Sequence, residues 1–395
     1  MTKRKIVVVT AGRSDFGLLL PTMRRIHDSS QFELETVAIG MHFQARQGLT
    51  WQQIQQSGFS IDYELQLSES DATTVNVASN LSRVVDEMAR ILAHSKPDAI
   101  LILGDRFEIF GAAIAAYLSR VPIIHFHGGE LTEALVDEGF RHSISKLAAL
   151  HLVATSEYER RVIQLGENPE RVRRVGAAGA ETVKNLRDKA RLLDRSVQDA
   201  FLDDQLILLT YHPVSLDKDF GVNGLRNLLS ALETHGFSRL VITAPNIDPG
   251  SDLISALLSD FAARNPISVS FVKSFGHENY LELMSQSAAI VGNSSSGLLE
   301  GSVIGVPVLD VGERQRGRIK PPNVVSVPDS FDDILRGIEL VLSPRHRDVA
   351  AKKSHPFGDG DTSLRALSAI TNYFETGAHL VVGKAFYDLE VASLK

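Results

Sequence analysis

The chain has 395 residues, 44% of them hydrophobic and 23% charged, which suits two globular domains and excludes wholesale disorder. Its 48 acidic residues exceed its 41 basic residues, and the resulting net charge of -7 disfavours nucleic acid as a partner. The sequence contains no cysteine, which excludes disulfides, thiolate zinc sites and cysteine nucleophiles.

The apolar segments predict a core and not a membrane anchor. No apolar run reaches the roughly 20 residues that a membrane span needs. The basic and then apolar start is short, and Gly12-Arg13-Ser14-Asp15 follows at once, so it indicates a first core strand and not a signal peptide. We expect a soluble, cytoplasmic protein with no membrane partner.

Short runs rich in Val and Ile recur along the chain. Each is too short for a buried helix and too continuous for a half-exposed strand, which predicts parallel strands covered on both faces. Helical spacing between them, as at 81–93 and 225–232, predicts α/β sheets with right-handed crossovers. The predicted strands are 6–9, 36–39, 99–103, 121–125, 150–154, 206–210, 240–243, 269–272, 288–291, 306–311 and 324–327.

The alternation of strands and helices weakens once, in a charged stretch between Ala180 and Gln205. We therefore predict two Rossmann-like, doubly wound domains, residues 1–180 and 181–370, that face a central cleft. Ligands of such sheets bind beyond the carboxyl ends of the strands, where a nucleotide could span both domains. The tail, 371–395, is predicted to be helical.

The loop after the first strand is a candidate anion site. Gly12 permits a sharp turn, and a helix that starts near Leu18 would offer free N–H groups to an anion. Arg13 could then reach a phosphate. The alternative is an ordinary strand-to-helix turn that Asp15 caps.

The loop Gly104-Asp105-Arg106-Phe107-Glu108 follows the strand at 99–103 directly. An acid at the carboxyl end of a strand, followed by an arginine, could be a general base that its neighbour holds in place. Asp105 is therefore a candidate base and Arg106 its companion. The alternative is that Asp105 caps the next helix.

The densest group of reactive side chains follows the strand at 121–125. Gly128 and Gly129 permit close approach of the backbone to a ligand. A helix that starts near Leu135 would place Asp137 and Arg141 on one face. Carboxylates beside an arginine and histidines suit acid and base chemistry, because like charges and burial drive pKa values apart. The candidates are His125, His127, Glu130, Glu133, Asp137, Glu138, Arg141 and His142.

Two other interpretations of this stretch stay open. A run of charges usually belongs to a solvated helix, although the Gly-Gly turn and the preceding strand argue for a site here. His125 and His127 are two residues apart and could share a metal, but no third ligand of matching spacing follows. We therefore predict neither a metal nor a cofactor.

The second half offers groups for a phosphate. His212 stands at the mouth of the strand 206–210, because Pro213 ends that strand. The segment 292–297, Gly-Asn-Ser-Ser-Ser-Gly, combines hydroxyls with N–H groups at a helix start and predicts a phosphate cradle. The arginines near Gly317 suit an anion as well, because guanidinium forks match phosphate oxygens, although they could form a solvated loop. From the residues alone we predict an enzyme that acts on a nucleotide-linked small molecule.

The motifs in this order resemble the UDP-N-acetylglucosamine 2-epimerase family, and most closely its hydrolysing branch, which feeds sialic and legionaminic acid synthesis. The resemblance covers about residues 5–374. It is carried by Gly104-Asp-Arg-Phe-Glu108, His127-Gly-Gly-Glu130, Asp137-Glu138, Arg141-His142, Pro245-Asn-Ile-Asp248, Gly292-Asn-Ser-Ser-Ser-Gly297 and Arg314-Gln-x-Gly-Arg318. It implies a glycosyltransferase-B-like fold whose last helix packs back on the first domain, and often a homodimer or homotetramer.

The resemblance also implies the chemistry. A base removes the C2 proton while UDP leaves C1, water adds to the resulting glycal, and C2 is reprotonated on the opposite face. The implied catalytic residues are Asp105, His127, Glu130, Asp137, Arg141 and His212. The implied residues that bind UDP and the substrate are Arg13, Arg106, His212, Asn246, Phe271, Val272, Phe275, Ser294, Ser295, Ser296, Glu300, Arg314 and Arg318, with Glu300 on the ribose and 271–275 beside the uracil.

The sequence departs from the family pattern at two places. His127 stands where many relatives, especially non-hydrolysing ones, have glutamate. The loop Gly176-Ala-Ala-Gly-Ala-Glu181 lacks the proline and the final Asp or Asn common in the family, which predicts an altered sugar pocket. A non-hydrolysing epimerase and a non-catalytic sensor of nucleotide sugars stay open as alternatives; a glycosyltransferase needs only one base and fits the carboxylates less well.

Overall fold

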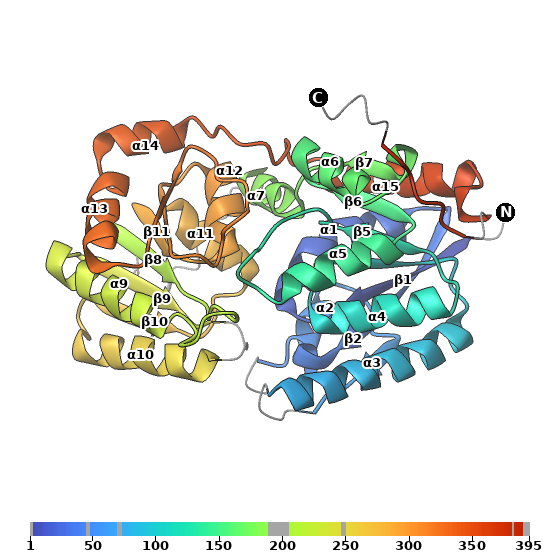
Figure 1. Cartoon of the computed structure of the whole chain (residues 1–395), viewed down its shortest axis with the longest axis horizontal. Helices are drawn as coiled ribbons and strands as arrows, with labels where there is room; N and C mark the ends of the chain where they lie inside the picture. The colour runs from blue at the N-terminus through green and yellow to red at the C-terminus, as the bar shows by residue number, and fades with distance from the viewer. Residues whose placement is uncertain are drawn as a thin grey trace. The chain divides into compact units, whose positions relative to one another are not determined.

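The computed structural model describes residues 3–44, 48–68, 73–188, 205–245, 250–380 and 383–389. The chain divides into two compact units (Figure 1). Unit 1 holds the described residues up to Glu130, the segment Asp137–Glu181 and the described residues from Gly358 onward. Unit 2 holds Leu131–Val136 and the described residues from Thr182 to Phe357.

Unit 1 is built on a seven-stranded parallel sheet of order β3-β2-β1-β4-β5-β6-β7. All five strands predicted for this half are present. The two additional strands, β3 and β7, have three residues each and lie at the sheet edges, where no continuous apolar run is needed. The strands are β1 Arg4–Thr10, β2 Phe32–Ile39, β3 Tyr63–Leu65, β4 Ala99–Leu103, β5 Ile123–Phe126, β6 Leu150–Val153 and β7 Val172–Arg174.

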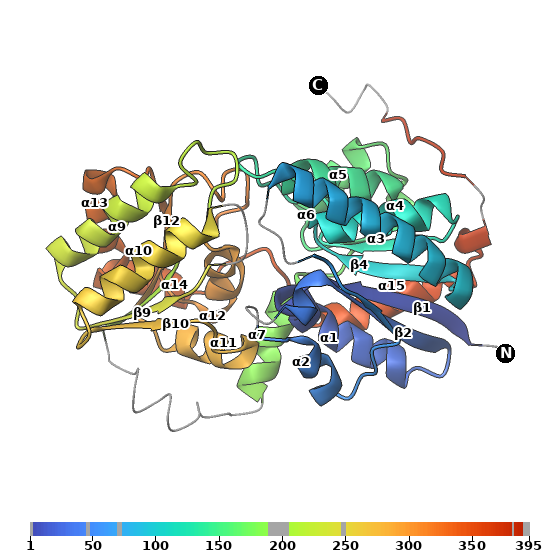
Figure 2. The ribbon, with the colours of Figure 1, turned by 90° about the horizontal axis from the view of Figure 1, so that it is seen from below.

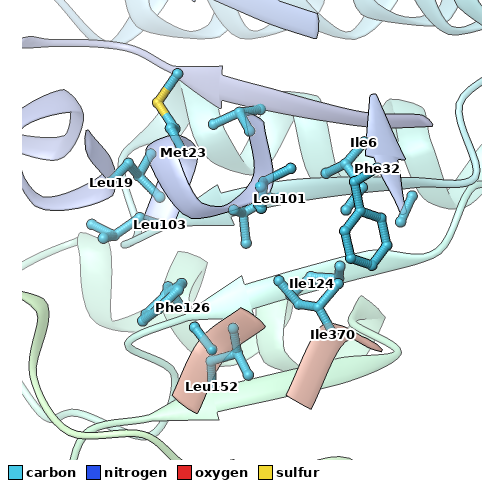
Figure 3. Close-up of a cluster of buried hydrophobic side chains, with 14 of the residues drawn as sticks. Ile6, Leu19, Met23, Phe32, Leu101, Leu103, Ile124, Phe126, Leu152 and Ile370 are labelled. Carbon is cyan, nitrogen blue, oxygen red and sulfur yellow. The ribbon is translucent and has the colours of Figure 1, made fainter. Parts of the chain in front are cut away.

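Helices cover both faces of this sheet. The helices α1 (Arg13–Asp28), α2 (Trp51–Gln56) and α15 (Thr362–Glu375) pack on one face. The helices α3 (Thr74–Ser95), α4 (Phe107–Leu118) and α5 (Asp137–Leu147) pack on the other. Figure 3 shows Leu19 and Met23 of α1 and Ile370 of α15 grouped with the strand residues Leu101 and Ile124. The described residues of the unit also form 3-10 turns at Gly40–Phe43, Pro169–Arg171 and Ala378–Leu380 and the helix α6 Ser156–Gln164. The helix α7, Ala178–Asp188, begins in unit 1 and continues into unit 2.

Two predicted helix boundaries differ from the structure. The first helix begins at Arg13 and not near Leu18, because the buried carboxylate of Asp15 accepts the N–H groups of Ala11 and Gly12, at 2.7 and 2.8 Å. The predicted helix at 371–395 begins earlier, at Thr362, and ends at Glu375. Its apolar residues complete the core of unit 1, which explains why the chain returns to this unit.

Unit 2 is built on a six-stranded parallel sheet of order β10-β9-β8-β11-β12-β13, and all six strands are predicted from the sequence. Its strands are β8 Leu206–Thr210, β9 Arg239–Thr243, β10 Val269–Val272, β11 Ala289–Gly292, β12 Val308–Val311 and β13 Val324–Val327. On one face pack α9 (Val222–His235), α10 (Ser251–Arg264) and α13 (Phe331–Val341), with α9 and α10 side by side (Figure 2). Further helices are α11 His277–Ser285, a π-helical turn Gly297–Gly301, α12 Ser302–Ile304 and α14 Pro344–Ala351.

The predicted class, two doubly wound parallel α/β domains, is confirmed. The strand order reverses between β1 and β4 in unit 1 and between β8 and β11 in unit 2, which makes these pairs the topological switch points. The predicted loops with Arg13 and Asp105 follow β1 and β4, and those with His212 and Ser294 follow β8 and β11. Each sheet therefore carries candidate residues where such folds bind ligands. No helix in the described part of the chain has the length and apolarity of a membrane span.

Candidate active site

Arg141 organises the carboxylates of unit 1. Its guanidinium is buried, with a side-chain exposure of 2%, and its Nη2 donates to Oδ2 of Asp105. Its Nη1 donates to Oε2 of Glu138 at 2.7 Å and to the backbone oxygen of Glu130 at 3.0 Å. One arginine therefore joins the loop after β4 to the first turn of α5. Asp105 does not cap α4, whose N-cap residue is Arg106.

The charges of this cluster support each other. Burial opposes the charge of Arg141, but the carboxylates of Asp105, Glu130 and Glu138 outweigh that effect and raise the pKa of the guanidinium. Glu138 also contacts His142: Nε2 of His142 lies 2.9 Å from Oε1 of Glu138. The side chains of Asp105 and Glu138 are each 23% exposed, so both carboxylates can still meet a ligand. Glu138 is a candidate from the sequence to which the family resemblance gives no catalytic role. It follows Asp137, which lies half-buried in the same turn.

His127 and Glu130 form a second buried pair. Nδ1 of His127 lies 2.8 Å from Oε1 of Glu130, and Nε2 accepts the backbone N–H of Ala178 at 3.2 Å. Because Nε2 is an acceptor, the ring proton of the neutral imidazole lies on Nδ1 and is donated to Glu130. His127 also adopts a left-handed φ of 65°, which is rare for a side chain of this size. The pair is therefore held in one orientation by α7 and by a strained backbone.

His125 links α5 to the loop of Asp105. Its Nε2 donates to the backbone oxygen of Gly104 at 2.9 Å, and its Nδ1 lies 3.2 Å from the hydroxyl of Ser145. Burial lowers the pKa of His125 to about 3, so the ring is neutral at physiological pH. Both ring nitrogens of His125 and His127 thus engage protein groups. No group of three or more His, Asp or Glu side chains in the described ranges is placed to hold a metal.

The paired glycines have a packing role that the sequence did not suggest. A Cβ at Gly128 would lie 2.8 Å from the hydroxyl of Ser145, and one at Gly129 would lie 2.5 Å from the backbone oxygen of Tyr158. On the Cβ side of both glycines α5 and α6 occupy the space, and the close approach of this backbone to a ligand stays a prediction. Only glycine at both positions lets the helices pack against this turn.

Two further charged side chains of unit 1 lie beside the switch point between β1 and β4. Arg13 is half-buried in the first turn of α1, and burial lowers its pKa. Within the described residues no carboxylate pairs with Arg13, which suits an anion as its partner. Arg106 donates to Oε2 of Glu108 at 3.3 Å, and burial raises the pKa of Glu108 although Arg106 opposes this shift.

In unit 2, Asn293 joins the two loops of the switch point. Its Oδ1 accepts the backbone N–H of His212 at 2.7 Å, and its Nδ2 donates to the backbone oxygen of His212 at 2.8 Å. Arg314 donates through Nε to the backbone oxygen of Pro213 and through Nη1 to that of Asn293. Burial, followed by the charge of Arg314, lowers the pKa of His212 well below its usual range. His212 is therefore a neutral hydrogen-bonding group here, and Asn293 is a structural residue that sequence reasoning missed.

A chain of hydroxyl groups runs under the predicted phosphate cradle. Thr243 and Thr210 are joined by a 2.7 Å hydrogen bond, and Thr210 lies 3.2 Å from the phenol of Tyr280. The phenol contacts Ser296 at 2.9 Å, and Ser296 contacts Ser294 at 2.9 Å. Burial raises the pKa of Tyr280, so the phenol keeps its proton. The phenol of Tyr280 thus orients the hydroxyls of the half-buried Ser296 and Ser294.

The other predicted binding residues of unit 2 occupy varied positions. Phe271 and Val272 end the edge strand β10, where Phe271 packs against the core, and Phe275 is half-buried before α11. Glu300 is buried in the π-helical turn, and Arg318 and Ser295 are half-buried. Arg316, one of the three arginines near Gly317, instead pairs with Glu133 at 2.7 Å. Asn246 lies outside the described residues.

Comparisons with known proteins agree with this fold. Residues 24–371 match the model of the UDP-N-acetylglucosamine 2-epimerase family. The chain is 31% identical to the polysialic acid biosynthesis protein P7 of Escherichia coli, over 98% of both chains. It is 32% identical to the UDP-N,N'-diacetylbacillosamine 2-epimerase (hydrolyzing) of Legionella pneumophila, over 92% of this chain and 94% of the other. The structure of the UDP-GlcNAc 2-epimerase of Neisseria meningitidis bound to UDP-GlcNAc superposes with a TM-score of 0.82 at 18% identity, over 93% of this chain and 100% of that one.

The fold is that of a doubly wound α/β protein, and loops with candidate ligand-binding residues lie at the switch point of each sheet. The chain belongs to the UDP-N-acetylglucosamine 2-epimerase family, and the resemblance stated from its motifs is confirmed.

Proposed function

We propose that the protein is a hydrolysing 2-epimerase of UDP-linked amino sugars. It releases UDP and N-acetylmannosamine, or the corresponding 2,4-diacetamido-trideoxy sugar. The hydrolysing activity in the name of the Legionella pneumophila relative supports the reaction type. The observation in this chain that carries the proposal is the buried Arg141, which holds two partly exposed carboxylates, Asp105 and Glu138, in one cluster.

The reaction needs proton transfer at C2 twice. One group removes the C2 proton while the C1–O bond to UDP breaks, which leaves a glycal. Water then adds its oxygen to C1, and a second group returns a proton to C2 on the opposite face. Asp105 and Glu138, with Asp137 beside them, supply carboxylates for these steps, and Arg141 stabilises their negative charge. Glu130 acts through His127, to which it is bonded.

The diphosphate of the substrate needs hydrogen-bond donors that are already in place. The hydroxyls of Ser294, Ser295 and Ser296 and the neighbouring N–H groups offer them in unit 2. Neutral His212 lies in one of the loops that Asn293 joins. Arg314 follows β12 and donates to the backbone oxygens of Pro213 and Asn293, and Arg318 lies further along the chain. The proposed substrate contacts also include Arg13 and Arg106 of unit 1. In unit 2 they include Glu300 on the ribose and, beside the uracil, Phe271, Val272 and Phe275. Asn246 is proposed from the family motif.

A product assay in heavy water tests the proposal. We expect incubation with UDP-N-acetylglucosamine, or with its 2,4-diacetamido-trideoxy analogue, to yield UDP and a free sugar that carries deuterium at C2. An intact, epimerised nucleotide sugar would mean a non-hydrolysing epimerase. Binding without any solvent deuterium at C2 would mean a non-catalytic sensor.

Substitution of Asp105 tests the carboxylate cluster. Asp105→Asn keeps the shape of the side chain but removes its charge, so we expect kcat to fall by roughly 10²–10⁴, the usual size of lost proton transfer. The affinity for UDP should stay within a few fold. Asp86→Asn, on the exposed Asp86–Arg90 pair of α3, is the matched control and should leave kcat unchanged. Near wild-type turnover of Asp105→Asn would remove this residue from the mechanism.

Two expectations from the sequence stay predictions. A cytoplasmic location is tested by cell fractionation. A homodimer or homotetramer is tested by light scattering on the purified chain.

A further inference from the structure

The C-terminal strap, residues 383–389, contacts the far end of the helix that carries the carboxylate cluster. Nζ of Lys384 donates to the backbone oxygens of Ala148, Lys146 and Ser145 at 2.6, 2.7 and 3.3 Å. It also pairs with the carboxylate of Glu167. These carbonyls lie at the C-terminal end of α5, where few backbone N–H groups remain to bond them; that of Ser145 also accepts the N–H of Ala148, at 3.3 Å. A lysine ammonium satisfies them and complements the negative end of the helix dipole.

The charges around Lys384 are consistent with an ionised anchor. Burial lowers the pKa of Lys384 to about 8, while Glu167 favours the charged form and Lys146 and Arg171 oppose it. Burial also opposes the charge of Glu167, but His151, Lys384 and Lys146 lower the pKa of that carboxyl to about 2. Both members of the pair therefore carry their charges at neutral pH.

The strap is seated by specific contacts and not by a large apolar surface. The backbone N–H of Tyr387 donates to the backbone oxygen of Gly166 at 2.9 Å. The ring of Phe386 lies where a Cβ at Gly166 would be, and Nζ of Lys146 lies 4.5 Å from the centroid of that ring. Phe386 itself is 62% exposed. Among the described residues, the contacts of Lys384 are thus the main polar attachment of the strap to the rest of unit 1.

A short path of hydrogen bonds joins this anchor to the candidate active site. Lys384 binds the backbone of Ser145, whose hydroxyl lies 3.2 Å from Nδ1 of His125. Nε2 of His125 donates to Gly104, the residue before Asp105. Within α5, Arg141 stands one turn before Ser145 and binds Asp105 directly. The far end of α5 and the loop of Asp105 are therefore tied together at two points.

We propose that Lys384 is a positioning residue for the epimerase reaction: it fixes the end of α5 so that Arg141 holds Asp105 and Glu138 in their reacting geometry. The inference rests on the proposed function of the carboxylate cluster. Lys384 does not touch the substrate in this role. It acts through the backbone of α5, and its loss displaces the carboxylates by a small amount, which is enough to slow proton transfer.

Kinetics of the full chain test this role. Lys384→Met keeps most of the aliphatic stem and removes the donors, so we expect kcat to fall about tenfold or more. The affinity for UDP, measured by calorimetry, should change less than about twofold, because the hydroxyl cradle lies in unit 2. Lys384→Arg, which also donates to carbonyls, should restore a large part of kcat. Lys352→Met, at an exposed lysine after α14, is the matched control.

A double substitution shows whether Lys384 affects kcat through the contact of the strap with α5. Gly166→Ala places a methyl group in the ring of Phe386 and should displace the strap, so it should lower kcat on its own. In the Lys384→Met background it should lower kcat little further, since both changes act on the same contact. Fully additive losses, or an unchanged kcat in Lys384→Met, would overturn the inference.

Hydrogen exchange separates this inference from the proposed function. In Lys384→Met we expect faster exchange of the amides at the end of α5, with no change in α13 of unit 2. A wild-type chain that turns over no UDP-sugar would refute the proposed function. Unchanged exchange of α5 in the variant would refute the positioning role, whatever the activity.

Discussion

The buried histidine of β5 leads to a quantitative prediction for acid stability. His125 is fully buried, and burial lowers its pKa to about 3 from an ordinary value of 6.5, although the carbonyl of Gly104 opposes the shift. The unfolded chain takes up a proton here as the pH falls below 6.5, while the folded chain does not. Stability that depends on this ring is therefore complete above pH 6.5 and is lost progressively as the pH falls toward 3.

The size of the effect follows from the two pKa values. At pH 5 the unfolded ring lies 1.5 pH units below its pKa of 6.5, and each unit corresponds to about 1.4 kcal/mol. His125 should therefore cost about 2 kcal/mol of unfolding free energy between pH 7.5 and pH 5. The variant His125→Gln keeps a donor for the oxygen of Gly104 but cannot titrate, so it should lose about 2 kcal/mol less over this interval.

Trp51 gives a selective readout of this effect. It is the single tryptophan of the sequence and lies half-buried in α2 of unit 1, the unit that contains His125. Urea titrations followed by its fluorescence at pH 7.5 and pH 5 give the unfolding free energy of wild type and variant at each pH. Contributions from other titrating groups cancel in the difference between the two proteins. An equal loss in both proteins would refute the assignment of a neutral, proton-excluding site to His125.

Two further predictions concern unit 2. Tyr280→Phe breaks the hydroxyl chain below Ser296, so the affinity for UDP should fall by about 0.5–1.5 kcal/mol in calorimetry; an unchanged affinity would mean that the chain does not orient the cradle. Gly292→Ala should destabilise unit 2 by several kcal/mol in thermal unfolding, because φ is 135° and the new methyl group would overlap the backbone oxygen of Thr210. Gly276→Ala, whose φ is 76° but which has open space, is its control and should cost only about 1 kcal/mol; equal losses would contradict the argument.

The central strands could be predicted because they are buried on both faces, which demands continuous apolar runs. The edge strand β3 has the sequence Tyr-Glu-Leu and β7 has Val-Arg-Arg, so neither carries that signal. They are strands because their backbones pair with β2 and β6, and not because of their own composition. Such elements follow from tertiary structure, which a local pattern does not contain.

The candidate sites could be predicted to the level of the loop. A doubly wound sheet gathers the carboxyl ends of its strands, so Asp105 and the segment after β5 had to lie near each other. Which carboxylate is accessible depends on contacts that are distant in the sequence. Glu130 is engaged by His127, whose tautomer is set by Ala178, and the backbone of Glu130 binds Arg141. No spacing rule shows these partners.

Glu181 illustrates how a departure from a family pattern can have a structural cause. The sequence suggested that its loop alters the sugar pocket, because the family commonly has Asp or Asn there. In the structure its buried carboxylate accepts the backbone N–H and the hydroxyl of Ser363, at 2.6 and 2.5 Å. Arg25 of α1 donates to the same hydroxyl, and Thr362 donates to the backbone oxygen of Ala177. A carboxylate at the start of α15 is stabilised by the helix dipole, so Glu181 fixes the point at which the chain re-enters unit 1 and closes its core.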